Sequence, residues 1–377
     1  MLLDKEQQRA EDERFMREAL RLARHAEGRT SPNPLVGAVI VKDGVIIAEG
    51  WHRAAGTPHA EVHALTMAGD LARGATLYVT LEPCAHVGRT GPCAVAVRDA
   101  GIRRVVAAMG DPNPKVAGKG FQILRDAGID VTVGVCEAEA RRLNEAFLHW
   151  ITTGRPFVTM KYAMTLDGKI VTRTGDSQWI SCEASRRYVH ALRDRSDAIL
   201  CGIGTVLADN PSLTTRLQGR KGKNPMRVIV DSQARTPLTS NVVTDGQALT
   251  VIATTEQAPE ARVKALAAAG AAVWRCGRGP EVDLTQLMDE LGRHEITSVL
   301  VEGGGTVNFS LLAAGLVQKV VAFVGTKLVG GQAATTPVEG AGFERLAEAV
   351  ELSNLTAETV GTDVVLTGYV KTTEPMK

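Results

Sequence analysis

Apolar residues recur along the first half of this chain at two alternating spacings. From Asp12 they follow a helical period, which predicts a helix to about Ala26. Short apolar runs bounded by turn residues predict strands at 38–42, 45–50, 75–80 and 103–108. Further helices are predicted at 60–68, 93–100 and 137–150. This alternation predicts an α/β fold with a mainly parallel sheet and helices on both faces.

A second alternating pattern follows a turn-rich stretch. Residues 152–156 read T-T-G-R-P, which is typical of a linker. After it, apolar runs predict strands at 157–163, 198–201, 226–231, 250–253, 298–302 and 319–324. We therefore expect two α/β domains, residues 1–152 and 153–377, each long enough to bury its own core.

Composition narrows the class of protein. The chain is 44% hydrophobic and 23% charged, and its net charge is +1 without a long run of Lys or Arg, so nucleic acid is not favoured as a partner. The six cysteines are too dispersed for a disulfide framework, which favours a reducing compartment. The N-terminal residues are charged and no run is long enough to span a membrane, so a cytoplasmic protein without a membrane partner is expected.

The candidate metal ligands and a candidate proton carrier lie between Thr57 and Cys93. His59, Cys84 and Cys93 offer one imidazole and two thiolates, which can hold zinc and leave its fourth tetrahedral position to water. Glu61 follows His59 by two residues, where its carboxylate can carry protons without binding the metal. A His/Cys/Cys zinc site with a glutamate that is not a ligand is typical of nucleobase deaminases. We expect one Zn²⁺ per chain.

A closed structural zinc site is the alternative. It would take a fourth protein ligand, for which His52, His63 and His86 are available. The absence of short repeated ligand pairs argues against this alternative. The spacing also departs from the usual P-C-x-x-C signature, since eight residues separate the two cysteines. Two glycines and a proline in this insert, residues 85–92, allow it to loop out and return.

Two glycine-bearing turns in the second half are candidate phosphate sites. Residues 202–207 read G-I-G-T-V-L and residues 301–308 read V-E-G-G-G-T-V-N, each between a predicted strand and a helix. Neither is followed about twenty residues later by an acidic strand end, so a dinucleotide site of the Rossmann type is not expected. Tight packing turns remain the alternative. From spacing alone, Asn33 fits a turn residue and His52 a loop residue as well as they fit functional groups.

The first half resembles the deaminase domain of the RibD family of bifunctional riboflavin-biosynthesis enzymes. The resemblance rests on S-P-N-P-L-V-G at 31–37, H-A-E at 59–61 and L-E-P-C-A-H-V-G-R-T-G-P-C at 81–93. The long spacing between the cysteines is a feature of this family. The resemblance implies a cytidine-deaminase-like three-layer domain. It also implies these roles: His59, Cys84 and Cys93 as zinc ligands, Glu61 as proton shuttle, and Asn33 and His52 as substrate contacts.

The second half resembles the reductase domain of the same family, which has a dihydrofolate-reductase-like α/β fold. The matching segments are 161–170, 176–181, 205–216, 230–232 and 301–308. The implied NADPH-binding residues are Ala163, Trp179, Thr205, Asp209, Ser232, Gly304, Gly305, Thr306, Val307, Asn308, Phe309 and Ser310. The implied substrate contacts are Ser177, Arg193, Leu213, Arg216 and Glu302. Lys161 and Asp167 are candidates for proton transfer.

The arginines can also be assessed by their chemistry alone. The guanidinium groups of Arg193 and Arg216 suit the oxygens of a sugar phosphate, although Arg193 also fits an ordinary cation on a helix surface.

The expected function is a two-step reaction on a small pyrimidine nucleotide. The first domain would deaminate a diaminopyrimidinone ribosylamine phosphate, and the second would reduce its ribosyl group to ribityl with NADPH. A tRNA or nucleoside deaminase is a second hypothesis, which the near-zero net charge disfavours. A protein that stores structural zinc without catalysis is a third. A homo-oligomer is expected.

Overall fold

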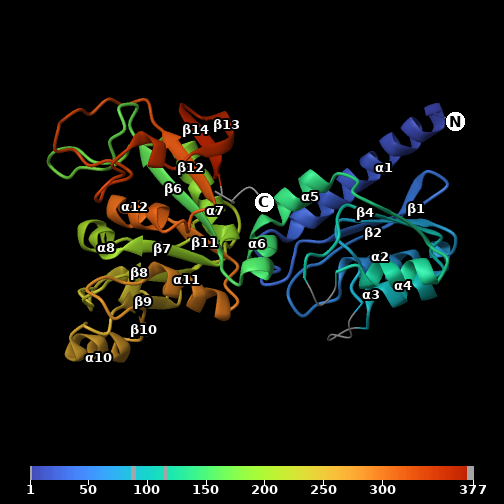
Figure 1. Ribbon diagram of the computed structural model, residues 1–377, viewed down its shortest axis with the longest axis horizontal. Coiled ribbons are helices and arrows are strands. Elements are labelled where there is room, and N and C mark those ends of the chain that lie inside the picture. Colours follow the sequence, from blue (N-terminus) through green and yellow to red (C-terminus); the bar gives the residue numbers. More distant parts are fainter. Residues whose placement is uncertain (1, 86–90, 114–116, 372–377) are drawn as a thin grey trace. The chain divides into compact units, whose positions relative to one another are not determined.

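The computed structural model describes residues 2–85, 91–113 and 117–371. The chain divides into two compact units, Met1–Gly154 and Arg155–Lys377 (Figure 1). The division falls within the turn-rich stretch at residues 152–156. No described helix is both long enough and apolar enough to cross a membrane.

The first unit contains a five-stranded mixed sheet in the order β2-β1-β3-β4-β5. Its strands are β1 (Gly37–Lys42), β2 (Val45–Trp51), β3 (Thr76–Val79), β4 (Arg104–Ala107) and β5 (Asp130–Val133). Strands β3, β4 and β5 are parallel, whereas β1 is antiparallel to both β2 and β3. β2, β3, β4 and β5 thus run in one direction and β1 alone opposes them, which agrees with the predicted mainly parallel sheet. The turn at Asp43-Gly44 reverses the chain into β2, and the helical crossover then returns β3 parallel to β2 and so antiparallel to β1.

Helices cover both faces of this sheet, which confirms the expected three layers. Figure 1 shows α2, α3 and α4 on one face and α1 with α5 on the other. The helices are α1 (Leu2–Ala23), α2 (Ala60–Ala68), α3 (Cys93–Asp99), α4 (Lys119–Asp126), α5 (Glu137–Leu143) and α6 (Glu145–Thr153). The core between the layers is built from buried residues of α1, α2, β1, β3 and β4.

Two helix predictions differ from the structure. Helix α1 begins at Leu2, about ten residues before the predicted start. The earlier start could not be predicted, because the first turns are polar and show no helical period of apolar residues. The single helix predicted at 137–150 is two helices that meet at Asn144, where ψ is 20° and φ is −107°. The buried Asn144 amide accepts from the Leu35 N–H at 2.8 Å and donates to the Leu35 carbonyl at 3.0 Å. This contact spans 109 residues of sequence, so no local pattern reveals the break.

A buried polar cluster ties α1 to the sheet. Tyr78 donates its hydroxyl to Asp12 Oδ1 at 2.9 Å, and Arg104 donates to both carboxylate oxygens at 2.8 Å. The Asp12 side chain is only 5% exposed and that of Arg104 only 16%. A charge pair at this depth must remain complete, because either partner left alone would be a buried uncompensated charge.

Asp12→Ala is therefore expected to destabilise the first unit by about 3 kcal/mol, because it removes the buried carboxylate from Arg104 and leaves it only the exposed Asp130, at 3.5 Å. Tyr78→Phe, which removes one hydrogen bond from the same cluster, should cost only about 1 kcal/mol. The measurement is urea unfolding followed by circular dichroism. If both variants lost the same free energy of unfolding, the ion pair would contribute no more to stability than the hydrogen bond from Tyr78.

The second unit contains a nine-stranded sheet in the order β10-β9-β8-β7-β11-β6-β12-β14-β13. The seven strands from β10 to β12 are parallel, and β14 and β13 add an antiparallel hairpin at one edge. The strands are β6 (Phe157–Met164), β7 (Ala198–Gly202), β8 (Met226–Val230), β9 (Thr250–Thr254), β10 (Ala272–Arg275), β11 (Ser298–Val301), β12 (Lys319–Val324), β13 (Leu352–Val360) and β14 (Asp363–Val370).

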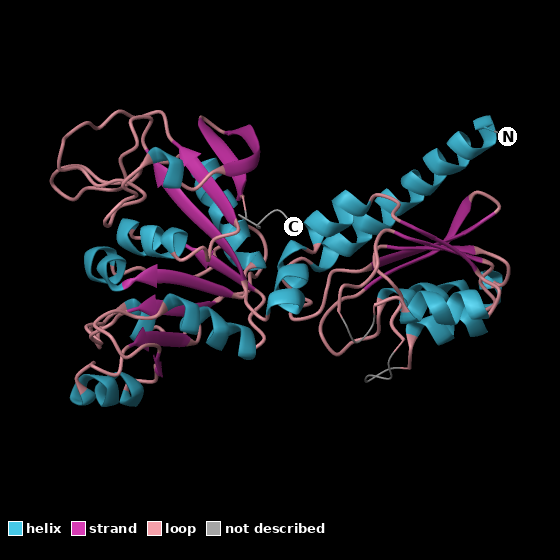
Figure 2. Cartoon of the chain, in the orientation of Figure 1, coloured by secondary structure: helices cyan, strands magenta, loops and turns pink. Residues whose placement is uncertain are grey.

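Helices connect the parallel strands of this unit (Figure 2). They are α7 (Glu183–Arg195), α8 (Ile203–Asp209), α9 (Asn241–Thr244), α10 (Glu260–Ala268), α11 (Leu284–Arg293) and α12 (Gly305–Ala313). Because parallel strands end at one edge of a sheet, the loops after β6, β7, β8, β11 and β12 are placed near one another. Most of the residues predicted for the reductase site lie at this edge.

Candidate active sites

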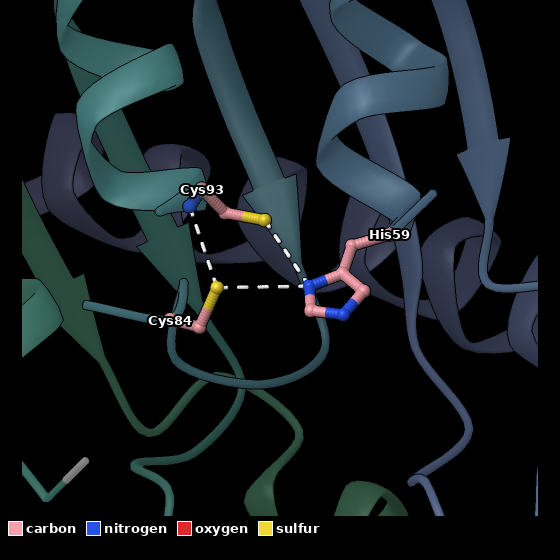
Figure 3. Close-up of side chains that lie close together, drawn as sticks. All are labelled: His59, Cys84 and Cys93. Carbon is pink, nitrogen blue, oxygen red and sulfur yellow. Dashed lines mark hydrogen bonds between the residues drawn. The ribbon is translucent and has the colours of Figure 1, made fainter. Parts of the chain in front are cut away.

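Three side chains from separate elements of the first unit converge on one point (Figure 3). His59 lies at the N-terminal end of α2, Cys84 lies after β3, and Cys93 is the first residue of α3. His59 Nδ1 lies 3.2 Å from Cys93 Sγ and 3.6 Å from Cys84 Sγ. All three donor atoms lie within 4.8 Å of one another.

This geometry fits a tetrahedral zinc ion. Zn–N distances of about 2.0 Å and Zn–S distances of about 2.3 Å at tetrahedral angles place nitrogen and sulfur roughly 3.5 Å apart. The two observed N–S distances lie on either side of that value. The donor set matches the predicted one, and these three residues form the only such group among the described residues.

The candidates for a fourth protein ligand do not join this group. Both ring nitrogens of His52 have hydrogen-bond partners in Asn33 and Pro58. His63 is not part of the cluster, although its Nε2 is buried and unpartnered among the described residues. His86 and most of the insert at 85–92 lie outside the described residues. The described geometry therefore favours a site with one position open over a closed structural zinc.

The surroundings of Cys84 favour its thiolate, the form that binds metal. The Cys93 backbone N–H points at Cys84 Sγ at 3.3 Å. A hydrogen bond from the Cys93 thiol, with a further one from His59, lowers the pKa of Cys84 well below its ordinary value even though burial opposes the shift.

Glu61 lies in the first turn of α2 and is only 3% exposed. Burial raises the pKa of its carboxyl to about 7, while its own backbone N–H and His59 act in the opposite direction. A carboxyl group with a pKa near neutrality can both accept and release a proton at physiological pH.

Asn33 and His52 form a hydrogen-bonded pair beside the zinc ligands. His52 Nδ1 lies 3.2 Å from the Pro58 carbonyl, which can only accept, so Nδ1 carries the proton. Nε2 must then accept from Asn33 Nδ2 at 3.1 Å. Burial lowers the pKa of His52 and keeps the ring neutral. Its ring packs edge-on against His59 at 5.3 Å, so the pair is fixed in orientation next to the metal ligands.

In the second unit, Arg193 of α7, Glu302 after β11 and Lys161 of β6 form a buried ionic cluster. Arg193 donates from Nε and Nη2 to the two Glu302 oxygens at 2.6 and 2.8 Å, and from Nη1 to the Thr214 carbonyl at 2.8 Å. Lys161 Nζ lies 3.9 Å from Glu302 Oε2. Burial alone would raise the pKa of Glu302, but Arg193 and Lys161 outweigh it and lower the pKa to about 2.

Because its donors are engaged in this way, Arg193 is less available for a phosphate than its sequence position indicates. Arg216 differs, because it is exposed and its guanidinium has no hydrogen bond or ion pair with the residues that the structure describes. Its backbone N–H donates to His190 Nδ1 at 3.2 Å. Burial, with Arg193 and Arg216 nearby, lowers the pKa of His190 to about 4, so this ring is neutral.

The sequence did not mark His190 as a neighbour of Arg193 and Arg216, because a histidine inside a helix gives no signal of its contacts. Glu82 was also missed, although it stands in the L-E-P-C segment directly before Cys84.

The two glycine-bearing turns meet at the edge of the sheet. Gly202 donates its N–H to the Gly303 carbonyl at 3.0 Å, so the starts of α8 and α12 lie side by side. Thr205 and Asp209 lie on α8, and residues 304–310 form the N-cap and first turns of α12. Within α12, Asn308 Oδ1 is buried and has no partner among the described residues. The structure thus brings together two segments that the sequence could only propose separately.

The other predicted residues lie on neighbouring loops of this unit. Ser232 follows β8, and its Oγ accepts from the Val282 N–H at 3.2 Å. Leu213 is buried, with a φ of 51°. Ala163 lies near the end of β6. Ser177 and Trp179 lie in the loop after β6, where Trp179 is 57% exposed.

Asp167 fastens two long loops together. Its carboxylate accepts from the Gly330 N–H at 2.6 Å, the Val329 N–H at 3.1 Å and the Thr165 hydroxyl at 2.5 Å. These hydrogen bonds, of which the one from Thr165 is the strongest, lower the pKa of Asp167 to about 2. The loop after β6 and the loop after β12, green and red at the upper left of Figure 1, are joined here. A carboxylate held in this way is a clamp and a poor proton donor at neutral pH.

Gly304 and Gly305 differ in the space around them, which allows a sharp test of this turn. A Cβ on Gly304 would meet only Thr205 Oγ1, at 3.7 Å, whereas one on Gly305 would lie 2.6 Å from Glu339 Cγ and 2.9 Å from the Thr336 carbonyl. Gly304→Val is therefore expected to leave the fold intact. If this turn holds NADPH, as the resemblance implies, the variant should weaken NADPH binding about 10- to 100-fold by crowding the approach to α12. Gly305→Val should instead destabilise the second unit.

Fluorescence titration with NADPH and thermal unfolding measure these two effects. Unchanged NADPH affinity in a folded Gly304→Val protein would remove this turn from the cofactor site.

Each of the two units matches a known protein family. The family model described as the cytidine and deoxycytidylate deaminase zinc-binding region matches residues 9–109, and the RibD C-terminal domain matches residues 156–366. The riboflavin biosynthesis protein RibD of Actinobacillus pleuropneumoniae is 45% identical over 354 residues, which cover 93% of each chain.

Two solved structures are similar over nearly the whole chain. Acinetobacter baumannii RibD has a TM-score of 0.87 and 38% identity, covering 97% of this chain and 100% of its own. A Thermotoga maritima protein has a TM-score of 0.85 and 37% identity, with the same coverage. It is described as a diaminohydroxyphosphoribosylaminopyrimidine deaminase/5-amino-6-(5-phosphoribosylamino)uracil reductase.

The fold, the His/Cys/Cys group and these matches define a zinc-binding deaminase region joined to a reductase domain in one chain. The chain belongs to the RibD family, the bifunctional deaminases and reductases of riboflavin biosynthesis.

Proposed function

We propose that the first unit hydrolytically deaminates 2,5-diamino-6-ribosylamino-4(3H)-pyrimidinone 5′-phosphate. The second unit then reduces the ribosyl side chain of the product to ribityl with NADPH. The observation that carries this proposal is the convergence of His59, Cys84 and Cys93 beside the buried carboxyl of Glu61, in a chain of the RibD family. The substrate is that described for the Thermotoga maritima relative.

In the deamination, His59, Cys84 and Cys93 would hold the zinc ion, which supplies the Lewis acidity that makes water nucleophilic near neutral pH. Glu61 would accept the proton that this water loses and pass it to the exocyclic nitrogen. Water adds to the ring carbon, the C–N bond breaks and ammonia leaves.

Asn33 and His52 would orient the pyrimidine in this site. With Nδ2 bonded to His52, Asn33 keeps its carbonyl oxygen and a second N–H for the polar edge of the ring. The neutral His52 fixes that amide in one orientation, since its own tautomer is set by Pro58.

The reduction adds one hydride and one proton to the sugar. The residues proposed to hold NADPH are Ala163, Trp179, Thr205, Asp209, Ser232 and residues 304–310. Lys161 is the better candidate for the proton donor, because burial lowers the pKa of its ammonium group, whereas Asp167 is held as a carboxylate. Glu302, paired with Arg193, would fix the position of Lys161.

Five residues remain proposed contacts of the reductase substrate: Ser177, Arg193, Leu213, Arg216 and Glu302. Arg216 is the stronger candidate for its phosphate, because the guanidinium of Arg193 already donates to Glu302 and Thr214.

The near-zero net charge and the charged N-terminal residues favour a cytoplasmic location without a nucleic-acid or membrane partner. The turn-rich stretch at 152–156 favours domains at 1–152 and 153–377. A homo-oligomer is also proposed. A reducing compartment would suit the six free cysteines, two of which must be thiolates to bind zinc. Light scattering of the purified protein measures its oligomeric state.

The test is to incubate the purified zinc-loaded protein with the diaminopyrimidinone nucleotide and identify the products. Without NADPH, one equivalent of ammonia and the deaminated ribosylamine are expected. With NADPH, the ribityl compound should form with matching NADPH oxidation. Ammonia release from cytidine or tRNA, and none from this nucleotide, would favour the second hypothesis. The absence of ammonia from all three would favour a structural zinc site.

A further inference from the structure

The Glu82 carboxylate receives four backbone hydrogen bonds in the first unit. Oε1 accepts from the N–H groups of Gly120 and Phe121 at 2.9 and 3.3 Å. Oε2 accepts from those of Gly118 and Asp111 at 3.0 and 3.2 Å. The side chain is buried, with 4% of the residue exposed. Each carboxylate oxygen thus accepts two hydrogen bonds, and every donor comes from outside the segment that contains Glu82.

These bonds replace a cap that α4 lacks. The residue before α4 is Gly118, which has no side chain and a φ of 77°. The N–H groups of the first turn of a helix have no partner within the helix, so another group must satisfy them. Glu82 does so from 38 residues away. The backbones also touch, because a Cβ on Gly120 would lie 1.9 Å from the Pro83 carbonyl oxygen.

The carboxylate joins two loops at the edge of the sheet where the zinc ligands lie. Strand β3 leads into Glu82 and Cys84, and the parallel neighbour β4 leads into Asp111. Cys84, two residues beyond Glu82, also accepts from the Ala94 N–H of α3 at 3.1 Å through its carbonyl. The position of Cys84 Sγ therefore depends on how firmly residues 82–84 are held from both sides.

We propose that Glu82 is a positioning residue of the deaminase centre: by fastening residues 82–84 to the loop after β4 and to α4, it fixes Cys84 as a zinc ligand. This inference rests on the proposed function of the first unit. Partners of this kind orient metal ligands, and their loss typically lowers metal affinity or activity about 10- to 100-fold.

The isosteric variant Glu82→Gln isolates the hydrogen bonds from the packing. A glutamine keeps the length of the side chain, but its NH₂ group would face one of the two pairs of backbone N–H donors. Tyr78→Phe is the matched control, since it weakens β3 through a different bond and touches neither Glu82 nor the zinc ligands. Zinc affinity is measured by competition with a chromophoric chelator at a temperature where both proteins are folded.

We expect Glu82→Gln to weaken zinc binding about tenfold or more and to lower the kcat/KM of deamination at saturating zinc, with the reductase unaffected. Tyr78→Phe should keep wild-type zinc affinity, even when its loss in Tm is as large. Wild-type zinc affinity in Glu82→Gln, or equal zinc loss in the control, would overturn the proposal.

If circular dichroism shows that Glu82→Gln does not fold, Glu82→Asp carries the same test. It keeps the charge but is one methylene too short to serve all four donors, so weaker zinc binding is again expected. Wild-type affinity in that variant would also refute the role. The chelator assay needs no substrate, so its result stands apart from whether the wild-type protein deaminates the proposed nucleotide.

Discussion

Glu61→Gln is expected to reduce the kcat of deamination about 10²- to 10⁴-fold while the protein keeps one zinc ion per chain. The glutamine fills the same buried space but cannot accept the proton that water loses or return it to the departing nitrogen. Glu61 is not one of the three converging donors, so metal binding should be unchanged. The measurements are ammonia release under saturating substrate and zinc content by atomic absorption.

Cys84→Ser and Cys93→Ser serve as the contrasting controls, because a hydroxyl replaces a thiolate ligand poorly and zinc occupancy should fall. Reduction of already deaminated substrate should remain intact in all three variants, since their side chains lie in the first unit. Unchanged turnover in Glu61→Gln with full zinc would exclude Glu61 as the proton carrier. Full occupancy in both serine variants would exclude the ligand set.

Lys161→Met is expected to lower the rate of NADPH oxidation about 10²-fold or more without loss of the fold. Methionine preserves the unbranched stem of Lys161 but cannot donate a proton. The remaining carboxylate, Glu302, stays paired with Arg193 through two hydrogen bonds, so no buried charge is left alone. Stopped-flow measurement of hydride transfer separates this effect from NADPH binding, which should change little.

The pH profile gives an independent test of Lys161. Burial lowers its pKa below the ordinary value of 10.5, and the group is a donor only when protonated. The wild-type reductase rate should therefore fall as pH rises, and it should do so below the pH expected for an exposed lysine. This alkaline limb should be missing in Lys161→Met. Asp167→Asn is the matched control and should keep the limb, because Asp167 is fixed as a loop clamp.

Local sequence was enough to predict most strands and the zinc ligands. The apolar runs of β1, β3, β4, β7, β8 and β12 are buried in the structure as short strands must be when a sheet is covered on both faces. His59, Cys84 and Cys93 could be identified because imidazole and thiolate are strong zinc ligands wherever the backbone brings them together. Their residue types define the chemistry before the fold is known.

The break at Asn144 and the partners of the charged residues could not be predicted in this way. Each depends on a partner distant in sequence: Asn144 on Leu35, Arg193 on Glu302, Asp167 on the turn at 329–330, and Glu82 on α4.

The sequence by itself determined which side chains can bind zinc, because that capacity belongs to imidazole and thiolate groups. Only the tertiary structure decided that Arg193 is engaged by Glu302 and Thr214 and that Asp167 accepts hydrogen bonds from a distant loop. The physical reason is that the pKa and hydrogen-bonding capacity of a buried charge are set by the groups folded against it.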